Sequence, residues 1–232
     1  MDFRCSCARP MPANAPMDTP AGAPARTATA SGLPALALVL VLVAALVLLS
    51  ACQRAPEEGF RNTDITGAGY GTTLALTDHT GTPRTLDDFR GDVVVVFFGY
   101  ISCPDFCPGT LSTLTAVKEQ LGPLGNRLKV LFVTVDPERD SQELLAQYVT
   151  AFDPDFVGLR GDAEATATVA RNFMIFFHKA PGATPDTYAV DHSTDSYVYD
   201  PSGRLRLLIR YGQDIGPIVA DIRHLLKEKS GT

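Results

Sequence analysis

The chain has 232 residues, of which 45% are hydrophobic and 20% charged, and its net charge is −6 at pH 7. These values are ordinary for a globular protein of one or two domains, and they exclude a collagen-like or largely disordered chain. No basic patch stands out in the sequence, so a nucleic-acid partner is not expected.

An apolar segment without any charge runs from Leu33 to Leu49. It is longer than the apolar core of a usual signal peptide, about 7–15 residues, and slightly shorter than the ~20 residues of a membrane span. The segment is followed by Ser50-Ala51-Cys52, which resembles the lipobox of bacterial lipoproteins, so we expect lipidation at Cys52. An uncleaved anchor helix is the alternative. Either interpretation places the protein at the bacterial cell membrane with its domain facing the periplasm.

The rest of the chain is expected to form one domain. We predict a leader over residues 1–51, a tether over 52–71 and the domain over 72–229. The domain begins with a hairpin, because a short strand from Thr72 to Thr77 is followed by the turn signal Asp78-His79-Thr80-Gly81.

Two continuous β-branched and aromatic runs follow, Val93–Phe98 and Leu128–Val135, and such runs are typical of strands buried on both faces of a sheet. Between them a helix is predicted to begin at Pro108, where the missing N–H costs nothing. Because a residue before proline avoids the helical region, Cys103 and Cys107 are both expected outside the helix. The apolar side of this helix would carry Leu111, Leu114, Val117 and Leu121.

The second half of the domain continues the alternation of strands and helices. Asp140 with Glu143 predicts a capping box that opens a helix, and Asp162 predicts the start of another. Other expected elements are strands at Phe156–Leu159, Ser196–Tyr199 and Leu205–Tyr211, an extended stretch at Met174–His178 and a helix at Ile215–Lys229. This order predicts an α/β fold with a mixed central sheet between two helical layers.

The cysteine pair is the clearest chemical signal. Cleavage before Cys52 would leave only Cys103 and Cys107 in the folded domain. The pair lies between a buried strand and a helix start, where the helix dipole favours a thiolate. It could form a disulfide, attack one or hold a soft metal such as Cu(I) or zinc. As a structural staple it would close a very short loop and would stabilise the fold little.

A metal at this pair needs at least one more ligand, and histidine is the expected type. His79 and His224 are predicted to lie on the surface, and His178 is a weaker candidate. His192 stands just before the terminal hairpin. On a thioredoxin-like topology that connection faces the cysteine loop, so His192 is the predicted third ligand. Asp191 would then orient the site or balance its charge, and the alternative is an ordinary acidic residue of a loop.

Four motifs occur in order: Phe98-Gly99-Tyr100 with Cys103-Pro104-Asp105-Phe106-Cys107-Pro108, Val133-Thr134-Val135-Asp136-Pro137, Phe152-Asp153-Pro154 and Asp191-His192-Ser193. In this order the chain resembles the Sco (SenC-type) family of copper chaperones for cytochrome c oxidase assembly. The resemblance implies a thioredoxin-like fold related to peroxiredoxins. It also implies one copper ion, Cu(I) or Cu(II), held by Cys103, Cys107 and His192.

The same resemblance implies a function and its partners. The family delivers copper to the CuA centre of cytochrome c oxidase subunit II, or reduces the cysteines of that subunit beforehand. Another periplasmic copper chaperone or a thioredoxin-like reductant would be a further partner, and the N-terminus would contact the membrane. The Asp136-x3-Asp140 segment matches a family signature; we expect Asp140 to serve as a helix cap and Asp136 to shape the loop or contact a partner.

The alternative function is that of an enzyme, a thiol–disulfide oxidoreductase in which one cysteine attacks and the other resolves. The spacing counts against it, because the thioredoxin motif is Cys-x-x-Cys. Thioredoxins also place a cis-proline opposite the cysteine loop, where this chain is expected to present Asp191-His192-Ser193. We therefore predict a metallochaperone that is not an enzyme, with accessory reductase activity as the remaining option.

Overall fold

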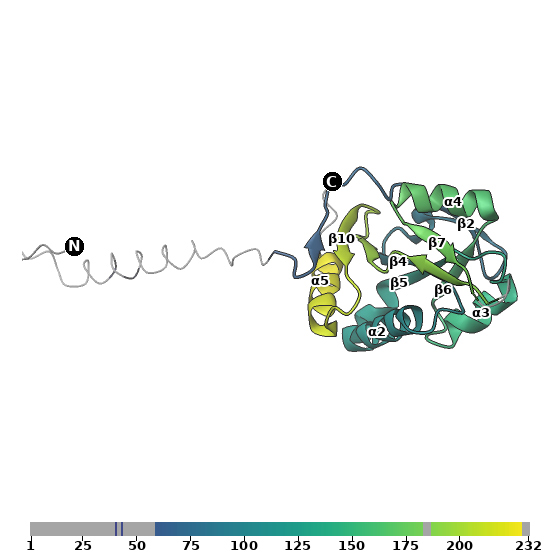
Figure 1. Ribbon diagram of the computed structural model, residues 1–232. Coiled ribbons are helices and arrows are strands. Elements are labelled where there is room, and N and C mark those ends of the chain that lie inside the picture. The colour runs from purple at the N-terminus through teal and green to yellow at the C-terminus, as the bar shows by residue number, and fades with distance from the viewer. Residues whose placement is uncertain (1–39, 41–42, 44–58, 183–186, 229–232) are drawn as a thin grey trace, which may run out of the picture. The chain divides into compact units, whose positions relative to one another are not determined.

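The computed structural model describes Leu40, Val43 and residues 59–182 and 187–228 (Figure 1). The chain divides into two units, Met1–Glu57 and Glu58–Thr232. Almost all of the predicted leader, the apolar segment and the lipidation site Cys52 lie outside the described residues, so these predictions stay predictions. In the described part of the chain, no helix is both long and apolar enough to cross a membrane.

An eight-stranded mixed sheet forms the centre of the domain, in the order β1-β10-β9-β4-β5-β6-β2-β3. The strands are β1 (Thr63–Asp64), β2 (Ala75–Asp78), β3 (Pro83–Thr85), β4 (Val93–Gly99), β5 (Leu128–Thr134), β6 (Val157–Arg160), β9 (Ser196–Tyr199) and β10 (Leu205–Ile209). Strands β4, β5 and β6 are parallel, whereas β9 and β2 join them antiparallel. Every residue of β4 is buried, as its sequence predicts.

Helices cover both faces of this sheet. They are α2 (Phe106–Leu121), α3 (Gln142–Thr150), α4 (Ala163–Asn172) and α5 (Ile215–Lys227), with short 3-10 helices η1 (Leu86–Phe89) and η2 (Gly122–Arg127). Helices α2, α3 and α5 lie on one side and α4 lies on the other (Figure 1). The predicted layers, the mixed sheet and the N-terminal hairpin β2–β3 are therefore all present.

A second, two-stranded sheet was only half expected. Strand β7 (Phe177–Ala180) pairs with β8 (Ala189–His192), and His192 lies opposite Phe177. The sequence predicted an extended stretch ending at His178 but no partner strand for it. We call this pair the β7–β8 ribbon. It places His192 at the end of a strand rather than in a connecting loop.

Two predicted helix starts are wrong by one or two residues. Ser141, not Asp140, caps α3, and its hydroxyl accepts the N–H of Leu144. Helix α2 begins at Phe106, so Cys107 is helical and Pro108 is its third residue. Proline is tolerated there because N–H groups in the first turn have no acceptor within the helix. The cap at Asp162 is confirmed by its bond to the N–H of Ala165.

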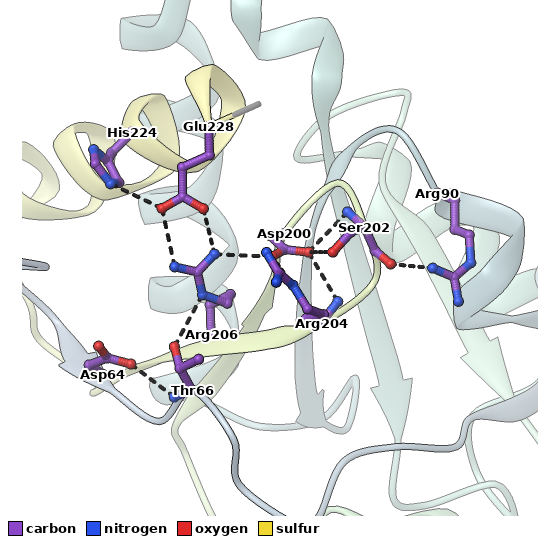
Figure 2. Close-up of polar contacts among 9 residues, drawn as sticks. All are labelled: Asp64, Thr66, Arg90, Asp200, Ser202, Arg204, Arg206, His224 and Glu228. Atoms are coloured by element: carbon purple, nitrogen blue, oxygen red, sulfur yellow. Dashed lines mark hydrogen bonds and ion pairs between the residues drawn. The ribbon is translucent and has the colours of Figure 1, made fainter. Parts of the chain in front are cut away.

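The ordered domain begins before the predicted boundary at Thr72. Residues 59–71 were expected to belong to the tether, but β1 pairs with β10 at the edge of the sheet. The buried carboxylate of Asp221 on α5 accepts the backbone N–H groups of Arg61 and Asn62. Nearby, Arg206 bonds the hydroxyl of Thr66 within a charged network that Figure 2 shows. This segment is therefore part of the folded domain.

Candidate metal centre

Three predicted ligands converge at the end of β4. The thiols of Cys103 and Cys107 and a ring nitrogen of His192 all lie within 4.8 Å of one another. Cys107 Sγ is 3.7 Å from His192 Nε2. Cys103 is 7% exposed and Cys107 is fully buried, and both cysteines are free. The β4–α2 loop supplies one thiol, the first turn of α2 the other, and the β7–β8 ribbon the imidazole.

Gly99 makes the room that the second thiol occupies. A Cβ atom at this position would lie 2.5 Å from Cys107 Sγ and 2.9 Å from the ring of Phe132. Real Cβ atoms do not approach other atoms so closely, so only glycine fits here. This role of Gly99 was not expected from the sequence, although the residue stands within the Phe98-Gly99-Tyr100 motif.

The tautomer of His192 is set by its own backbone neighbour. Nδ1 lies 2.8 Å from the carbonyl oxygen of Ser193, and because a carbonyl only accepts, Nδ1 must carry the proton. Nε2 of the neutral ring therefore directs its lone pair toward Cys107. Burial lowers the pKa of His192, which favours this neutral, metal-binding form.

Burial dominates the chemistry of Cys107 as well. The position at the helix start predicts a thiolate, but burial raises the pKa of the Cys107 thiol well above its ordinary value. The backbone N–H of Tyr100 acts in the opposite direction without outweighing this effect. In the absence of a cation, the thiol therefore keeps its proton at neutral pH. A bound soft ion would take the place of that proton.

The site opens into a groove of about 390 Å³, lined by residues that include Tyr100, Cys103, Pro104, Phe106, Val190 and His192. Tyr100 packs edge-on against the His192 ring at 5.8 Å between ring centres. At the mouth, Phe106 is 46% exposed and contacts Tyr211, which is 45% exposed. A partner could therefore reach Cys103 and His192, which line the groove, from this side.

The other predicted histidines lie outside this cluster. His178 is exposed and lies opposite Asp191 in the ribbon, and Asp191 is exposed too. His224 is on the surface as predicted, where it pairs with Glu228 at 3.1 Å. His79 is partly buried instead of freely exposed, because its Nδ1 accepts the N–H of Gly158 at 3.0 Å.

The aspartates of the Asp136-x3-Asp140 segment are buried beside the site and are not among its three candidate ligands. Asp140 Oδ2 accepts the hydroxyl of Thr134 at 2.6 Å and the N–H of Ile101 at 3.1 Å. The prediction that Asp140 is explained fully as a helix cap is therefore wrong. It connects the end of β5 to the loop that carries Cys103.

The donor set is suited to a soft metal ion. Two sulfur atoms and one imidazole nitrogen match the preferences of copper, above all Cu(I) for the thiolates. A closed structural zinc site would need four ligands, and the cluster in the described residues has three. The arrangement also leaves the two thiols close enough to approach each other, so a reversible disulfide is a second chemical option.

Comparisons with known proteins agree with this chemistry. The sequence model of the SCO1/SenC family matches residues 63–227. The mitochondrial SCO2 homologue of Mus musculus is 39% identical over 132 residues, covering 56% of this chain and 52% of that protein. The chain thus spans about half the length of this relative. The SCO2-like protein of Rickettsia felis is 32% identical over 170 residues, which cover 72% of this chain and 82% of that protein.

Solved structures share the architecture. ScoI of Bradyrhizobium japonicum with copper bound is 31% identical with a TM-score of 0.62, covering 67% of this chain and 99% of that one. Yeast Sco1 with copper bound is 30% identical with a TM-score of 0.65, covering 71% and 92%. The likeness confirms the predicted α/β, thioredoxin-like fold. Both proteins hold the ion that the sequence predicts for this chain.

Proposed function

The chain belongs to the SCO1/SenC family, and we propose that it is a copper metallochaperone whose ligands are Cys103, Cys107 and His192. The observation that carries this proposal is the convergence of the three donor atoms within 4.8 Å at the end of β4. Burial keeps the Cys107 thiol protonated and the His192 ring neutral, which suits a cation that arrives as the proton of Cys107 leaves. An imidazole with its lone pair already directed inward completes the set.

The geometry also supports release of the ion. The groove beside the cluster is open, and Cys103 keeps a small exposed surface. An acceptor thiol or imidazole could therefore bind the ion before all three ligands of this chain have let it go. Ligand exchange of this kind needs both thiols reduced, so a disulfide between Cys103 and Cys107 would prevent binding.

Membership of the family supports a proposal for the destination of the ion. We propose delivery to the CuA centre of cytochrome c oxidase subunit II, with the domain on the periplasmic side of the bacterial cell membrane. In this scheme the chain is attached through lipidated Cys52 or through an anchor helix over Leu33–Leu49. The intact mass of the protein extracted from membranes distinguishes the two forms of attachment.

The first test is copper stoichiometry on the full chain, reduced and kept without oxygen. We expect about one copper ion per chain for the wild type, sharply weakened Cu(II) binding for His192→Ala, and loss of binding when Cys103 and Cys107 are both changed to Ser. Copper affinity that survives loss of both thiols would contradict the proposal.

A thiol–disulfide reductase role is the second candidate, favoured by two free thiols in one cluster. In this role the thiols would reduce a disulfide of subunit II and become a disulfide themselves. Rapid reduction of such a disulfide, or of insulin, by a chain that binds no copper would favour this candidate over the chaperone.

A further inference from the structure

Two buried carboxylates at the end of β5 reach toward opposite halves of the metal centre. Asp140 contacts Ile101, two residues before Cys103. Asp136 contacts Tyr188, four residues before His192. One aspartate of the segment thus meets the thiol half of the site, and the other meets the imidazole half.

The contact with Tyr188 is made at three points. Its hydroxyl donates to Asp136 Oδ1 at 2.7 Å. Its carbonyl oxygen accepts from Nη1 of Arg139 at 2.8 Å. Its ring lies under the Arg139 guanidinium, 3.6 Å from ring centre to Cζ. Arg139 is itself fixed, because its Nε donates to Asp136 Oδ2. We call these three residues the Asp136 brace.

The brace holds an element that has little support from the main sheet. Strands β7 and β8 pair only with each other, and the ribbon forms a sheet of its own in the described residues. Two-stranded ribbons are marginally stable by themselves in water. Tyr188 immediately precedes β8, so fixing Tyr188 fixes the start of the strand that ends at His192.

The brace contains a buried hydrogen-bond donor without a partner, which a purely stabilising role does not explain. Asp136 is fully buried, and Nη2 of Arg139 is buried with no hydrogen-bond partner among the described residues. A buried donor left unpaired is unfavourable. Nη2 has no hydrogen bond in the arrangement that puts the guanidinium over the Tyr188 ring. The same arrangement places Cζ 5.7 Å from the ring centre of Tyr100. Tyr100 in turn contacts His192.

We propose that Asp136, Arg139 and Tyr188 are positioning residues for His192, which set the imidazole half of the copper site and leave the thiol half unchanged. The inference rests on the proposed function, since it assumes that His192 is a copper ligand. It predicts that damage to the brace separates the two oxidation states of copper. Cu(II) depends on the imidazole, whereas Cu(I) is held mainly by thiolates.

The test compares Cu(II) and Cu(I) affinities and the Cu(II) electron paramagnetic resonance spectrum of full-length variants. For Asp136→Asn we expect Cu(II) affinity to fall about 10–100-fold, the usual loss when a group that orients a metal ligand is removed. Cu(I) affinity should stay near the wild-type value, and the spectrum should shift toward that of His192→Ala. Tyr188→Phe removes one bond of the brace and should give a smaller change of the same kind.

Asp78→Asn is the matched control. Asp78 is also buried and paired with an arginine, Arg84, at 2.8 Å, but it lies at the end of β2. It should lower the melting temperature without changing either copper affinity. Equal losses of Cu(I) and Cu(II) in Asp136→Asn, or an unchanged Cu(II) spectrum in both brace variants, would overturn the inference while the His192→Ala effect stands. If His192→Ala has no effect on Cu(II), the proposed ligand set fails first.

Discussion

The buried polar groups at the two ends of the central sheet differ in their ionisation. The cysteine loop follows the last residue of β4, whereas Asp200 lies beside the start of β4, because Val94 pairs with Tyr199. At the Asp200 end, carboxylates and guanidinium groups bond one another (Figure 2). At the metal end, two thiols and an imidazole face one another, and the ion pair of Asp136 and Arg139 lies beside this cluster.

The Asp200 end keeps its acids ionised. Burial opposes ionisation of Asp200, but bonds from Ser202, Arg204 and Arg206 outweigh burial and lower its pKa to about 2. Arg206 bonds both Asp200 and Glu228, at 3.0 and 2.6 Å. The charges of this end therefore cancel within the protein. Its bonds join the segment that contains Thr66, the β9–β10 turn and α5.

At the metal end, burial keeps groups of the cluster and its neighbour Asp140 neutral, whereas Asp136 and Arg139 beside them form an ion pair. Burial raises the pKa of Cys107 and of Asp140, and burial lowers the pKa of His192. Each shift favours the uncharged form. Because Arg139 is already paired with Asp136, an incoming metal ion can displace the proton of Cys107 and supply a positive charge to the cluster.

The largest effect on stability is expected at the Asp200 end. Arg206→Met leaves the carboxylates of Asp200 and Glu228 without their shared partner. Breaking a buried pair from one side typically costs about 3–5 kcal/mol, and we expect a loss near the lower figure because Arg204 still pairs with Asp200. Urea unfolding measures the loss, and copper affinity should not change. A change in copper affinity would contradict the separation of the two ends.

Gly99→Ala should be the corresponding change at the metal end. The added methyl would overlap Cys107 Sγ and the Phe132 ring, and overpacking of this kind costs about 1–3 kcal/mol. Because the displaced atom is a proposed copper ligand, copper affinity should fall much more than in Arg206→Met. Gly91→Ala is a control without steric overlap, since nothing lies within 4 Å of a Cβ there, although its positive φ adds some backbone strain. Normal copper binding by Gly99→Ala would contradict the role given to this glycine.

The main strands and helices could be predicted from the sequence because the patterns that indicate them involve neighbouring residues. Strands β4 and β5 are continuous buried runs, and Asp162 caps its helix from the position that the pattern indicates. His192 was found through the order of the elements and a family motif. These features need only neighbouring residues or a known topology.

The features that the sequence missed depend on distant partners. Ser141 and Asp140 are both residue types that cap helices. The Asp140 carboxylate instead accepts the N–H of Ile101, 39 residues away, so Ser141 is the cap. Strand β8 has four residues, of which only Val190 is buried, so its pattern is too short to indicate a strand. The bond between Asp136 and Tyr188 spans 52 residues. The Asp136-x3-Asp140 spacing did mark these two aspartates in the sequence, but it does not identify the residues that they contact.

The smallest predicted effect is a gain in stability. Asp140→Asn should raise the free energy of unfolding at pH 7 by a small amount, because asparagine removes the cost of holding an ionised carboxylate at a buried position. The folded-state pKa of Asp140 is raised. As the pH rises through the unfolded-state pKa near 3.8, the unfolded chain therefore loses this proton first, and ionisation of Asp140 costs stability above that range. The asparagine oxygen can still accept from Ile101 and Thr134, so the loop geometry should persist.

Asp200→Asn should show the reverse pH profile, which makes it the matched partner in this experiment. Its lowered pKa contributes stability that is present above about pH 4 and is lost as the pH falls toward 2. Asp200→Asn should thus be destabilised at pH 7 and approach the wild type at pH 2, whereas Asp140→Asn should gain at pH 7 and match the wild type at pH 3. Chemical unfolding across this range measures both. If Asp140→Asn lost as much stability at pH 7 as Asp200→Asn, Asp140 would be a stabilising ionised carboxylate like Asp200, and the contrast between these two aspartates would fail.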